Sequence, residues 1–260
     1  MRTLLATFAV TVMWFGSAHA GQRVVSINPC FDDWLPQWLA PAWQMVPSTE
    51  HGNRLEQIVA LKPDYVVAGS FVGRQLRLAL QERVQLTTVP YVADWSAWRE
   101  AVLQLGLELE QKYQAEQWLA RQEAALASYD LRSLGNTLIL MPNGFTWGEQ
   151  SWIYQLLQQH QLQLSPLSGS GDLVRLNLEQ VLQSEPDTVI LEGFSTEYAR
   201  AQDWLWHDGL QDWLIQRRVI EVDGQVASCA ATRALDYLQQ LSRQQDANPA
   251  PAEGLQDAAR

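Results

Sequence analysis

The chain has 260 residues, a formal net charge of −11 and twelve tryptophans. This length is enough for one large domain or for two lobes of ordinary size. The negative charge argues against nucleic acid and against anionic membrane surfaces as partners, because both repel an acidic protein.

Residues 1–20 have the features of a secretory signal peptide. Arg2 is followed by the apolar run "LLATFAVTVMWFG", and "AHA" before Gly21 is typical of a cleavage site, with the cut after Ala20. The apolar run is too short for a comfortable membrane span, and no later stretch approaches the length that a span needs. No cysteine sits at the cut, so a lipid-anchored start is not expected. The sequence therefore predicts export to the periplasm.

Residues 21–95 alternate short β-branched runs with helical stretches, and this pattern predicts parallel strands in a first α/β lobe. The expected strands are "RVVSI", Tyr65–Ala68 and "VQLTTVPYV". The expected helices are "FDDWLPQWLA", interrupted by Pro36, then Arg54–Leu61 and Gly73–Glu82.

The period changes in residues 96–130. From Ser96 to Tyr129 the segment holds Gly106 but no proline, and apolar residues recur at helical spacing. We predict one long amphipathic helix that joins two halves of the chain as a rigid strut, capped at its start by Asp94 or Ser96.

The α/β pattern returns in residues 131–243, which we expect to form a second lobe. The expected strands are "NTLILMP", "DTVILEG" and "RVIEVD", and the expected helices are Gln150–Gln159, Leu176–Leu182, Asp203–Gln216 and Ala231–Arg243. Residues 244–260 lack an apolar period and are rich in Ala, Pro, Gln and charge, so we predict a disordered tail.

One segment occurs twice, as "LEQIVALKPDYVVAG" from Leu55 and as "LEQVLQSEPDTVILEG" from Leu178. In both copies a helix ends near the residue before proline, which disfavours helical geometry there, and a buried strand follows. The same element order flanks both copies. Duplication of one helix–strand unit explains this better than chance does.

The order of these segments resembles a known family. "RVVSINP", the segment around Lys62-Pro63-Asp64, the long linking helix and "ATRALDYLQQL" together resemble the helical-backbone periplasmic substrate-binding proteins of ABC importers for iron chelates and vitamin B12. The resemblance implies two lobes joined by one rigid helix, a ligand held between them, delivery to a membrane permease, and no catalysis. It also implies an acidic docking residue on each lobe. Glu197 suits the second lobe, whereas the first lobe has Gly73 where an acid is expected.

Ligands of open α/β sheets bind beyond the carboxyl ends of the strands, so two facing lobes would surround one cleft with strand-end loops. These loops are Asn28–Phe31, Ser48–Gly52, Ser70–Phe71, Tyr91–Trp95, Asn143–Glu149, Gly193–Ser195 and Ser228–Arg233. Their aromatic faces suit a flat, partly apolar chelate or macrocycle. The candidate ligand contacts are Cys30, Phe31, Glu50, His51, Ser70, Phe71, Tyr91, Trp95, Phe145, Trp147, Phe194, Cys229 and Arg233. Arg233 is either an anion contact for the cargo or a helix-surface arginine.

The two cysteines, Cys30 and Cys229, both fall on loops expected to face the cleft, one in each lobe. Three interpretations stay open. The cysteines form a disulfide, as an oxidising compartment favours; they are free thiols that contact a ligand or metal, together with Glu50 and His51; or they are small buried residues without a role.

Bare metal is a poor candidate for the cargo, because His51, His160 and His207 do not converge in the predicted layout. We expect no intrinsic cofactor and no resident metal. The sequence has no G-x-S-x-G elbow and no H-E-x-x-H motif, and "SGSGD" lacks the residues of a phosphate loop. We therefore expect that the protein is not an enzyme.

Two functional hypotheses follow. The first is a monomeric periplasmic receptor that delivers a ferric siderophore, a corrinoid or haem to an inner-membrane ABC permease. The second is an envelope protein of the same fold that does not transport, with Cys30 and Cys229 linked. The sequence cannot choose among these cargoes.

Overall fold

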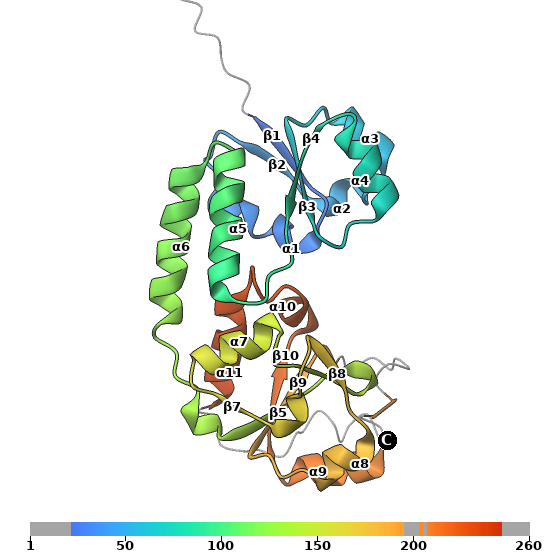
Figure 1. Ribbon diagram of the computed structural model, residues 1–260, viewed down its shortest axis with the longest axis vertical. Coiled ribbons are helices and arrows are strands. Elements are labelled where there is room, and N and C mark those ends of the chain that lie inside the picture. Colours follow the sequence, from blue (N-terminus) through green and yellow to red (C-terminus); the bar gives the residue numbers. More distant parts are fainter. Residues whose placement is uncertain (1–21, 195–202, 205–206, 246–260) are drawn as a thin grey trace, which may run out of the picture.

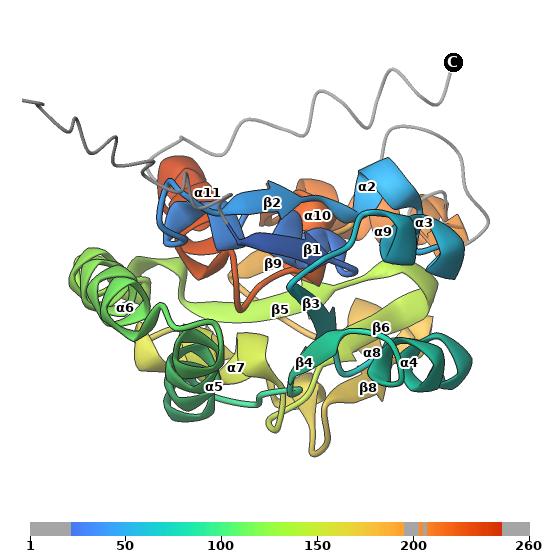
Figure 2. The same cartoon turned by 90° about the horizontal axis from the view of Figure 1, so that it is seen from above.

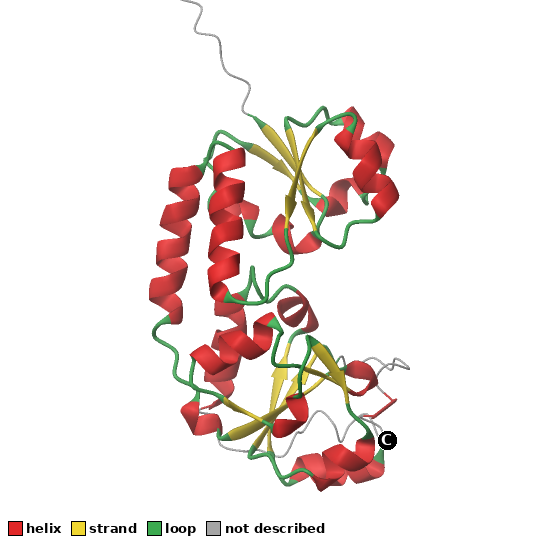
Figure 3. Cartoon of the chain, in the orientation of Figure 1, coloured by secondary structure: helices red, strands yellow, loops and turns green. Residues whose placement is uncertain are grey.

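A computed structural model describes residues 22–194, 203–204 and 207–245, and these residues form two α/β lobes (Figure 1 and Figure 3). The predicted signal peptide lies outside the described residues. So does the predicted tail except for its first two residues, which belong instead to helix α11 (Ala234–Gln245). No helix in the described part of the chain is long and apolar enough to cross a membrane.

The first lobe contains a four-stranded parallel sheet in the order β2-β1-β3-β4. Its central strands carry valines that are buried on both faces of the sheet, as parallel strands between helices require. The strands are β1 (Arg23–Ser26), β2 (Gln44–Val46), β3 (Tyr65–Gly69) and β4 (Gln85–Val89). The helices are α1 (Pro29–Asp32), α2 (Ser48–His51), α3 (Leu55–Ala60) and α4 (Arg74–Gln81), with a 3-10 turn at Leu35–Gln37.

The second lobe repeats this plan with a parallel sheet in the order β10-β9-β5-β7 and adds a separate antiparallel pair, β6 and β8. The strands are β5 (Asn136–Leu140), β6 (Phe145–Trp147), β7 (Gln163–Leu164), β8 (Leu173–Arg175), β9 (Thr188–Glu192) and β10 (Arg218–Val222). The helices are α7 (Trp152–Gln159), α8 (Leu178–Gln183), α9 (Asp208–Ile215), α10 (Gly224–Ser228) and α11, with 3-10 turns at Arg132–Leu134, Pro142–Gly144 and Pro166–Ser168.

The two parallel sheets share one topology. Counted along the chain, the main-sheet strands of each lobe lie in the spatial order second, first, third, fourth. The duplicated segment forms α3 with β3 in the first lobe and α8 with β9 in the second, so each copy supplies the third strand of its sheet. The structure therefore supports duplication of a whole lobe scaffold.

The aspartate of the Pro-Asp pair makes the same contacts in both copies. The Asp64 backbone N–H donates to the Arg23 carbonyl at 2.9 Å, and the Asp64 carboxylate accepts from the Arg23 backbone N–H at 2.6 Å. Asp187 makes the same two bonds to Asn136, both at 2.8 Å. The aspartate thus fixes the start of the third strand against the start of the first, and its role is structural.

The prediction of one continuous linking helix is wrong. The chain forms α5 (Trp95–Glu108) and α6 (Lys112–Leu126), which lie side by side (Figure 1 and Figure 2). The Glu110 N–H donates to the Leu107 carbonyl at 3.1 Å, and the Gln111 N–H donates to the Gly106 carbonyl at 2.6 Å. These bonds, with Glu110 at φ +56°, form a Schellman ending without glycine at its left-handed position.

The helix hairpin joins the lobes through one apolar core. Helix α6 leads the chain from the first lobe into the second (Figure 1). Trp34 of the first lobe lies 5.0 Å from Trp98 of α5, and Trp98 lies 6.4 Å from Trp152 of α7 in the second lobe, measured between ring centroids. All three rings belong to one buried cluster. The lobes are therefore packed against a shared support.

Candidate functional site

A pocket of about 200 Å³ lies between the lobes, at the carboxyl ends of the strands. The first lobe contributes the residues that follow β1, β3 and β4, and the second contributes β6, the start of α7 and the segment 227–232. Six aromatic side chains line the pocket, and they are Phe31, Phe71, Tyr91, Trp98, Trp147 and Trp152. Phe71 is 87% exposed and Tyr91 is 48% exposed, which places these two rings at the mouth of the pocket.

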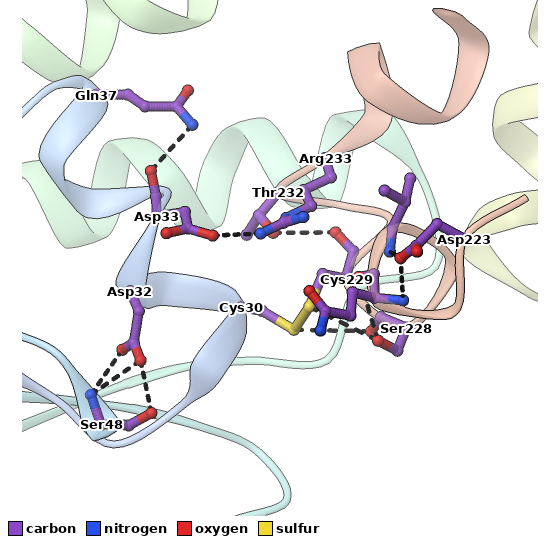
Figure 4. A network of polar contacts seen from close by, with 12 residues as sticks. Cys30, Asp32, Asp33, Gln37, Ser48, Asp223, Ser228, Cys229, Thr232 and Arg233 are labelled. Atoms are coloured by element: carbon purple, nitrogen blue, oxygen red, sulfur yellow. Dashed lines mark hydrogen bonds and ion pairs between the residues drawn. A yellow bond between two sulfur atoms is a disulfide. The ribbon is translucent and has the colours of Figure 1, made fainter. Parts of the chain in front are cut away.

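The loop after β1 is held by a short cap. The Asn28 side-chain oxygen accepts from the Cys30 backbone N–H at 3.0 Å, and Pro29 occupies the first turn of α1. Gly69, at the end of β3, leaves room for this cap, since a Cβ there would lie 2.6 Å from the Asn28 side-chain nitrogen. The carboxylate of Asp32 accepts from the backbone N–H of Ser48 at 2.9 Å and ties α1 to α2 (Figure 4).

Cys30 and Cys229 form a disulfide that links the two lobes beside the pocket (Figure 4). Their Cα atoms are 5.2 Å apart, although 199 positions separate the residues in sequence. Cys229 follows α10, whose start is capped by the Asp223 side chain. The first of the three interpretations is correct, and the two that left the cysteines as free thiols or as unpaired buried residues are wrong.

Two polar contacts also cross between the lobes. The Arg233 guanidinium pairs with the Asp33 carboxylate (Figure 4). Arg233 does not line the pocket. The Tyr91 hydroxyl donates to the Asp172 carboxylate at 3.2 Å. Burial, followed by the nearby Asp172 charge, raises the pKa of Tyr91. Together with the disulfide, these contacts hold the lobes at three points around the pocket.

A buried carboxyl group supports one pocket wall from behind. Glu192, the last residue of β9, is 1% exposed, and its carboxylate accepts from the Trp147 indole N–H at 2.6 Å and from the Tyr237 hydroxyl. Burial raises the pKa of Glu192 to about 7, and the two hydrogen bonds oppose that rise. Burial and the Glu192 charge raise the pKa of Tyr237 well above its usual value. This network fixes the edge of the Trp147 ring.

Seven of the thirteen predicted ligand contacts line the pocket, namely Cys30, Phe31, Ser70, Phe71, Tyr91, Trp147 and Cys229. The structure places several others elsewhere. Glu50 is exposed on α2, and His51 is 2% exposed, with one ring nitrogen 2.9 Å from the Ser26 carbonyl and the other accepting from the Asn53 N–H. His51 thus braces the first lobe.

The remaining predicted contacts also lie away from the pocket. The Trp95 indole N–H donates to the Glu123 carboxylate at 3.2 Å, between α5 and α6, and the Trp95 ring lies 6.0 Å from Trp152. Phe145 lies on β6 and is absent from the pocket lining. Phe194 packs against the hydrophobic cluster that β5, β9 and α9 form inside the second lobe. The predicted docking residue Glu197, and Ser195 of the predicted cleft loop, lie outside the described residues.

Sequence reasoning missed two tryptophans of the pocket. Trp98 lies within the segment expected to form the linking helix, and it is buried at 1% exposure yet also lines the pocket. Trp152 is the first residue of α7, within the helix expected over Gln150–Gln159. Their position in the sequence was a usable signal for a pocket contact. Both residues lie in the first turn of a helix that follows a strand-end loop, and such a turn lies at the same edge of the lobe as the loop.

In the described part of the chain, no three His, Cys, Asp or Glu side chains gather in a way that could hold a metal ion. His160 hydrogen-bonds the Tyr129 carbonyl at 3.1 Å, and the His207 ring accepts from the Gly209 N–H at 3.1 Å. These contacts keep both histidines in local structural roles, away from the pocket between the lobes.

The fold is that of the two-lobed substrate-binding proteins of ABC importers, as the sequence resemblance led us to expect. Solved structures with this fold include a possible iron-binding, periplasmic solute-binding protein from Staphylococcus epidermidis, at TM-score 0.65 and 12% identity over 86% of this chain and 98% of that one. They also include the periplasmic haem-binding protein BhuT in complex with two haems, at TM-score 0.65 and 15% identity over 92% and 99%.

A third such structure is the siderophore-binding protein BauB, bound to a complex of two acinetobactin molecules and ferric iron, at TM-score 0.63 and 16% identity over 89% of this chain and 95% of that one. No model of a known protein family matches the sequence, and no curated protein matches it. At these identities the likeness defines the fold, and the ligand has to be argued from the pocket.

Proposed function

We propose that this chain is an extracytoplasmic solute-binding protein that captures a metal chelate between its lobes and delivers it to an ABC permease in the inner membrane. The observation that carries the proposal is the pocket between the lobes, at the strand ends, with its six aromatic side chains. Proteins of this fold named above bind haem or a ferric siderophore. The cargo is a ferric siderophore, a corrinoid or haem, and the protein acts as a monomeric binder without catalysis and without a nucleic-acid partner.

The proposed location rests on two features. Residues 1–20 read as a cleaved signal peptide, and the Cys30–Cys229 disulfide suits an oxidising compartment such as the periplasm. Amino-terminal sequencing of the mature protein is expected to begin at Gly21. A mature chain that begins at Met1 would overturn this location.

A binding titration tests the cargo class. Purified protein is titrated with cobalamin, haem and a panel of ferric siderophores, and binding is read from tryptophan emission and, for the coloured ligands, from equilibrium dialysis. Trp98, Trp147 and Trp152 line the pocket, so a bound chelate is expected to change their emission. No binding by any chelate, in the presence or absence of reductant, would refute the proposal.

A pair of matched variants locates the binding. Phe71→Ala removes an exposed ring at the pocket mouth, and Tyr113→Ala removes an exposed ring on α6 that does not line the pocket. We expect Phe71→Ala to weaken chelate binding about tenfold, in the range of losses caused by removing a ring contact. Tyr113→Ala is expected to bind as the wild type does. Equal affinities of the two variants would place the ligand elsewhere.

The disulfide favours a second candidate function. A covalent link across the lobes is unexpected in a receptor that must release cargo, and Gly73 stands where the resemblance calls for an acidic docking residue. The alternative is an envelope sensor, chaperone or assembly factor of the same fold. Uptake of a labelled chelate by cells that lack the gene separates the two. Lost uptake supports transport, and unchanged uptake supports the alternative.

A further inference from the structure

We infer that the disulfide-closed protein admits one uncharged planar group, about the size of a single ring system, into the pocket between its lobes. This inference rests on the proposed function, because it names the part of the ligand that the same pocket holds. The rest of the ligand, including any metal centre, stays at the mouth beside Phe71 and Tyr91.

The first argument is that the pocket cannot widen by separating the lobes. The Cys30–Cys229 bond, the Arg233–Asp33 ion pair and the Tyr91–Asp172 hydrogen bond cross from one lobe to the other. The ion pair is shielded on one side, since the Arg233 side chain is 22% exposed. The disulfide is covalent and persists in an oxidising compartment. Ligand exchange in this form therefore passes through the existing mouth.

The second argument is size. The pocket measures about 200 Å³. An apolar cavity of about 150 Å³ is enough to bind benzene, whereas sites for whole drug-sized ligands range from about 300 to 1,000 Å³. A complete haem or corrinoid belongs to the larger class. The pocket therefore holds a single ring system or the edge of a macrocycle, and it cannot enclose a whole chelate.

The third argument is charge. None of the described residues that line the pocket is Asp, Glu, Lys, Arg or His. The polar side chains among them are Asn28, Ser70, Ser228 and Thr232, together with the Tyr91 hydroxyl, which is already bonded to Asp172. The lining tryptophans add indole N–H donors: that of Trp147 is bonded to Glu192, and those of Trp98 and Trp152 are buried without a hydrogen-bond partner among the described residues. An ionised ligand group would lose its hydration here without gaining a countercharge, which is costly in an apolar site. The group that enters is therefore uncharged.

The fourth argument is shape. Six aromatic side chains in a pocket of this size form flat walls, and flat groups pack on such walls in offset or edge-to-face arrangements. Trp147 is fixed in place because its indole N–H donates to the buried Glu192 carboxylate. A wall that is set before binding favours a rigid planar group over a flexible chain, since neither partner has to be ordered further.

Isothermal titration calorimetry of the oxidised protein with indole and with indole-3-carboxylate tests size and charge together. The two probes share one ring system and differ by one negative charge. We expect indole to bind and indole-3-carboxylate to bind at least tenfold more weakly. Ala231→Phe, which fills the pocket, is expected to abolish indole binding, while Ala124→Phe on the exposed face of α6 leaves it unchanged. Equal affinities of the two probes, or indole binding that survives Ala231→Phe, would overturn the inference.

Haem binding to the oxidised protein and to a Cys30→Ser/Cys229→Ser variant tests the limit that the closed lobes set. We expect the variant to bind haem at least tenfold more tightly, and reduced wild-type protein provides the same comparison if the variant folds poorly. Haem binding of equal strength in both forms would overturn the size limit and leave the proposed function standing. Indole binding without binding of any chelate in either form would refute the proposed function and leave the inference standing.

Discussion

The buried carboxyl of Glu192 predicts a measurable pH dependence of stability. Its pKa in the folded protein is about 7, against an ordinary value of 4.5. Well below pH 4.5 the Glu192 carboxyl is protonated in both the folded and the unfolded state, so ionisation of Glu192 does not reduce the stability of the fold. As the pH rises from 4.5 through 7, the unfolded state loses its proton first, so the free energy of unfolding falls.

The size of this effect follows from the two pKa values. Their difference, at about 1.4 kcal/mol per pH unit, corresponds to about 3 kcal/mol over the whole range. Between pH 5 and pH 8 the free energy of unfolding is expected to fall by about 2.5 kcal/mol. This is less than the full value because Glu192 is already partly ionised in the unfolded state at pH 5. Glu192→Gln cannot ionise and removes this share of the pH dependence.

Urea unfolding at pH 5 and pH 8, followed by tryptophan emission, measures the difference. The wild-type free energy of unfolding is expected to change between the two pH values by about 2.5 kcal/mol more than that of Glu192→Gln. Glu221→Gln is the matched control, because Glu221 lies on the neighbouring strand β10 and is exposed. The reasoning fails if Glu192→Gln keeps the wild-type pH dependence, or if Glu221→Gln removes it.

Three further predictions concern stability. Replacing Cys30 and Cys229 by serine opens a loop of 199 positions and is expected to lower the free energy of unfolding by about 5 kcal/mol, because the unfolded chain gains entropy. Urea unfolding measures this loss, and a loss below about 1 kcal/mol would contradict the expectation. Glu110→Gly is expected to raise the melting temperature by relieving about 1 kcal/mol at a left-handed position, and Glu110→Ala gives no such gain. Gly106→Val is expected to lower the melting temperature, because the added Cβ would lie 2.6 Å from the Cβ of Ala115. An unchanged melting temperature would refute the close packing of α5 on α6.

The central strands could be predicted from sequence because a strand that is buried on both faces has a continuous run of apolar residues. β3 and β9 are continuous apolar runs after a Pro-Asp pair, and both lie inside their sheets. β2, β6, β7 and β8 were missed because they have two or three residues each, too few for a period to show. The turn between α5 and α6 was missed because its left-handed residue is Glu110 rather than glycine.

The site was predictable in position but not in detail. The rule that loops follow strand ends placed Phe31, Phe71 and Tyr91 around one pocket, since it depends on topology alone. It could not say which way a side chain in such a loop points. His51 turns inward to the Ser26 carbonyl because a buried carbonyl needs a donor, and sequence does not show that need. Glu192, at the end of the apolar run "TVILEG", was a usable signal, because a charged residue at that place requires partners.

The two lobes share a scaffold, but the pocket between them is asymmetric. Asp64 anchors Arg23 as Asp187 anchors Asn136, so the first strands of the two lobes correspond residue by residue. In that correspondence the position of Cys30 is taken by Asn143 in the second lobe, and Cys30 pairs instead with a residue beyond the last strand, β10. Duplication therefore accounts for the sheets and for the place of the loops. It does not account for the disulfide, so the feature that sets the width of the pocket belongs to the loops of this chain.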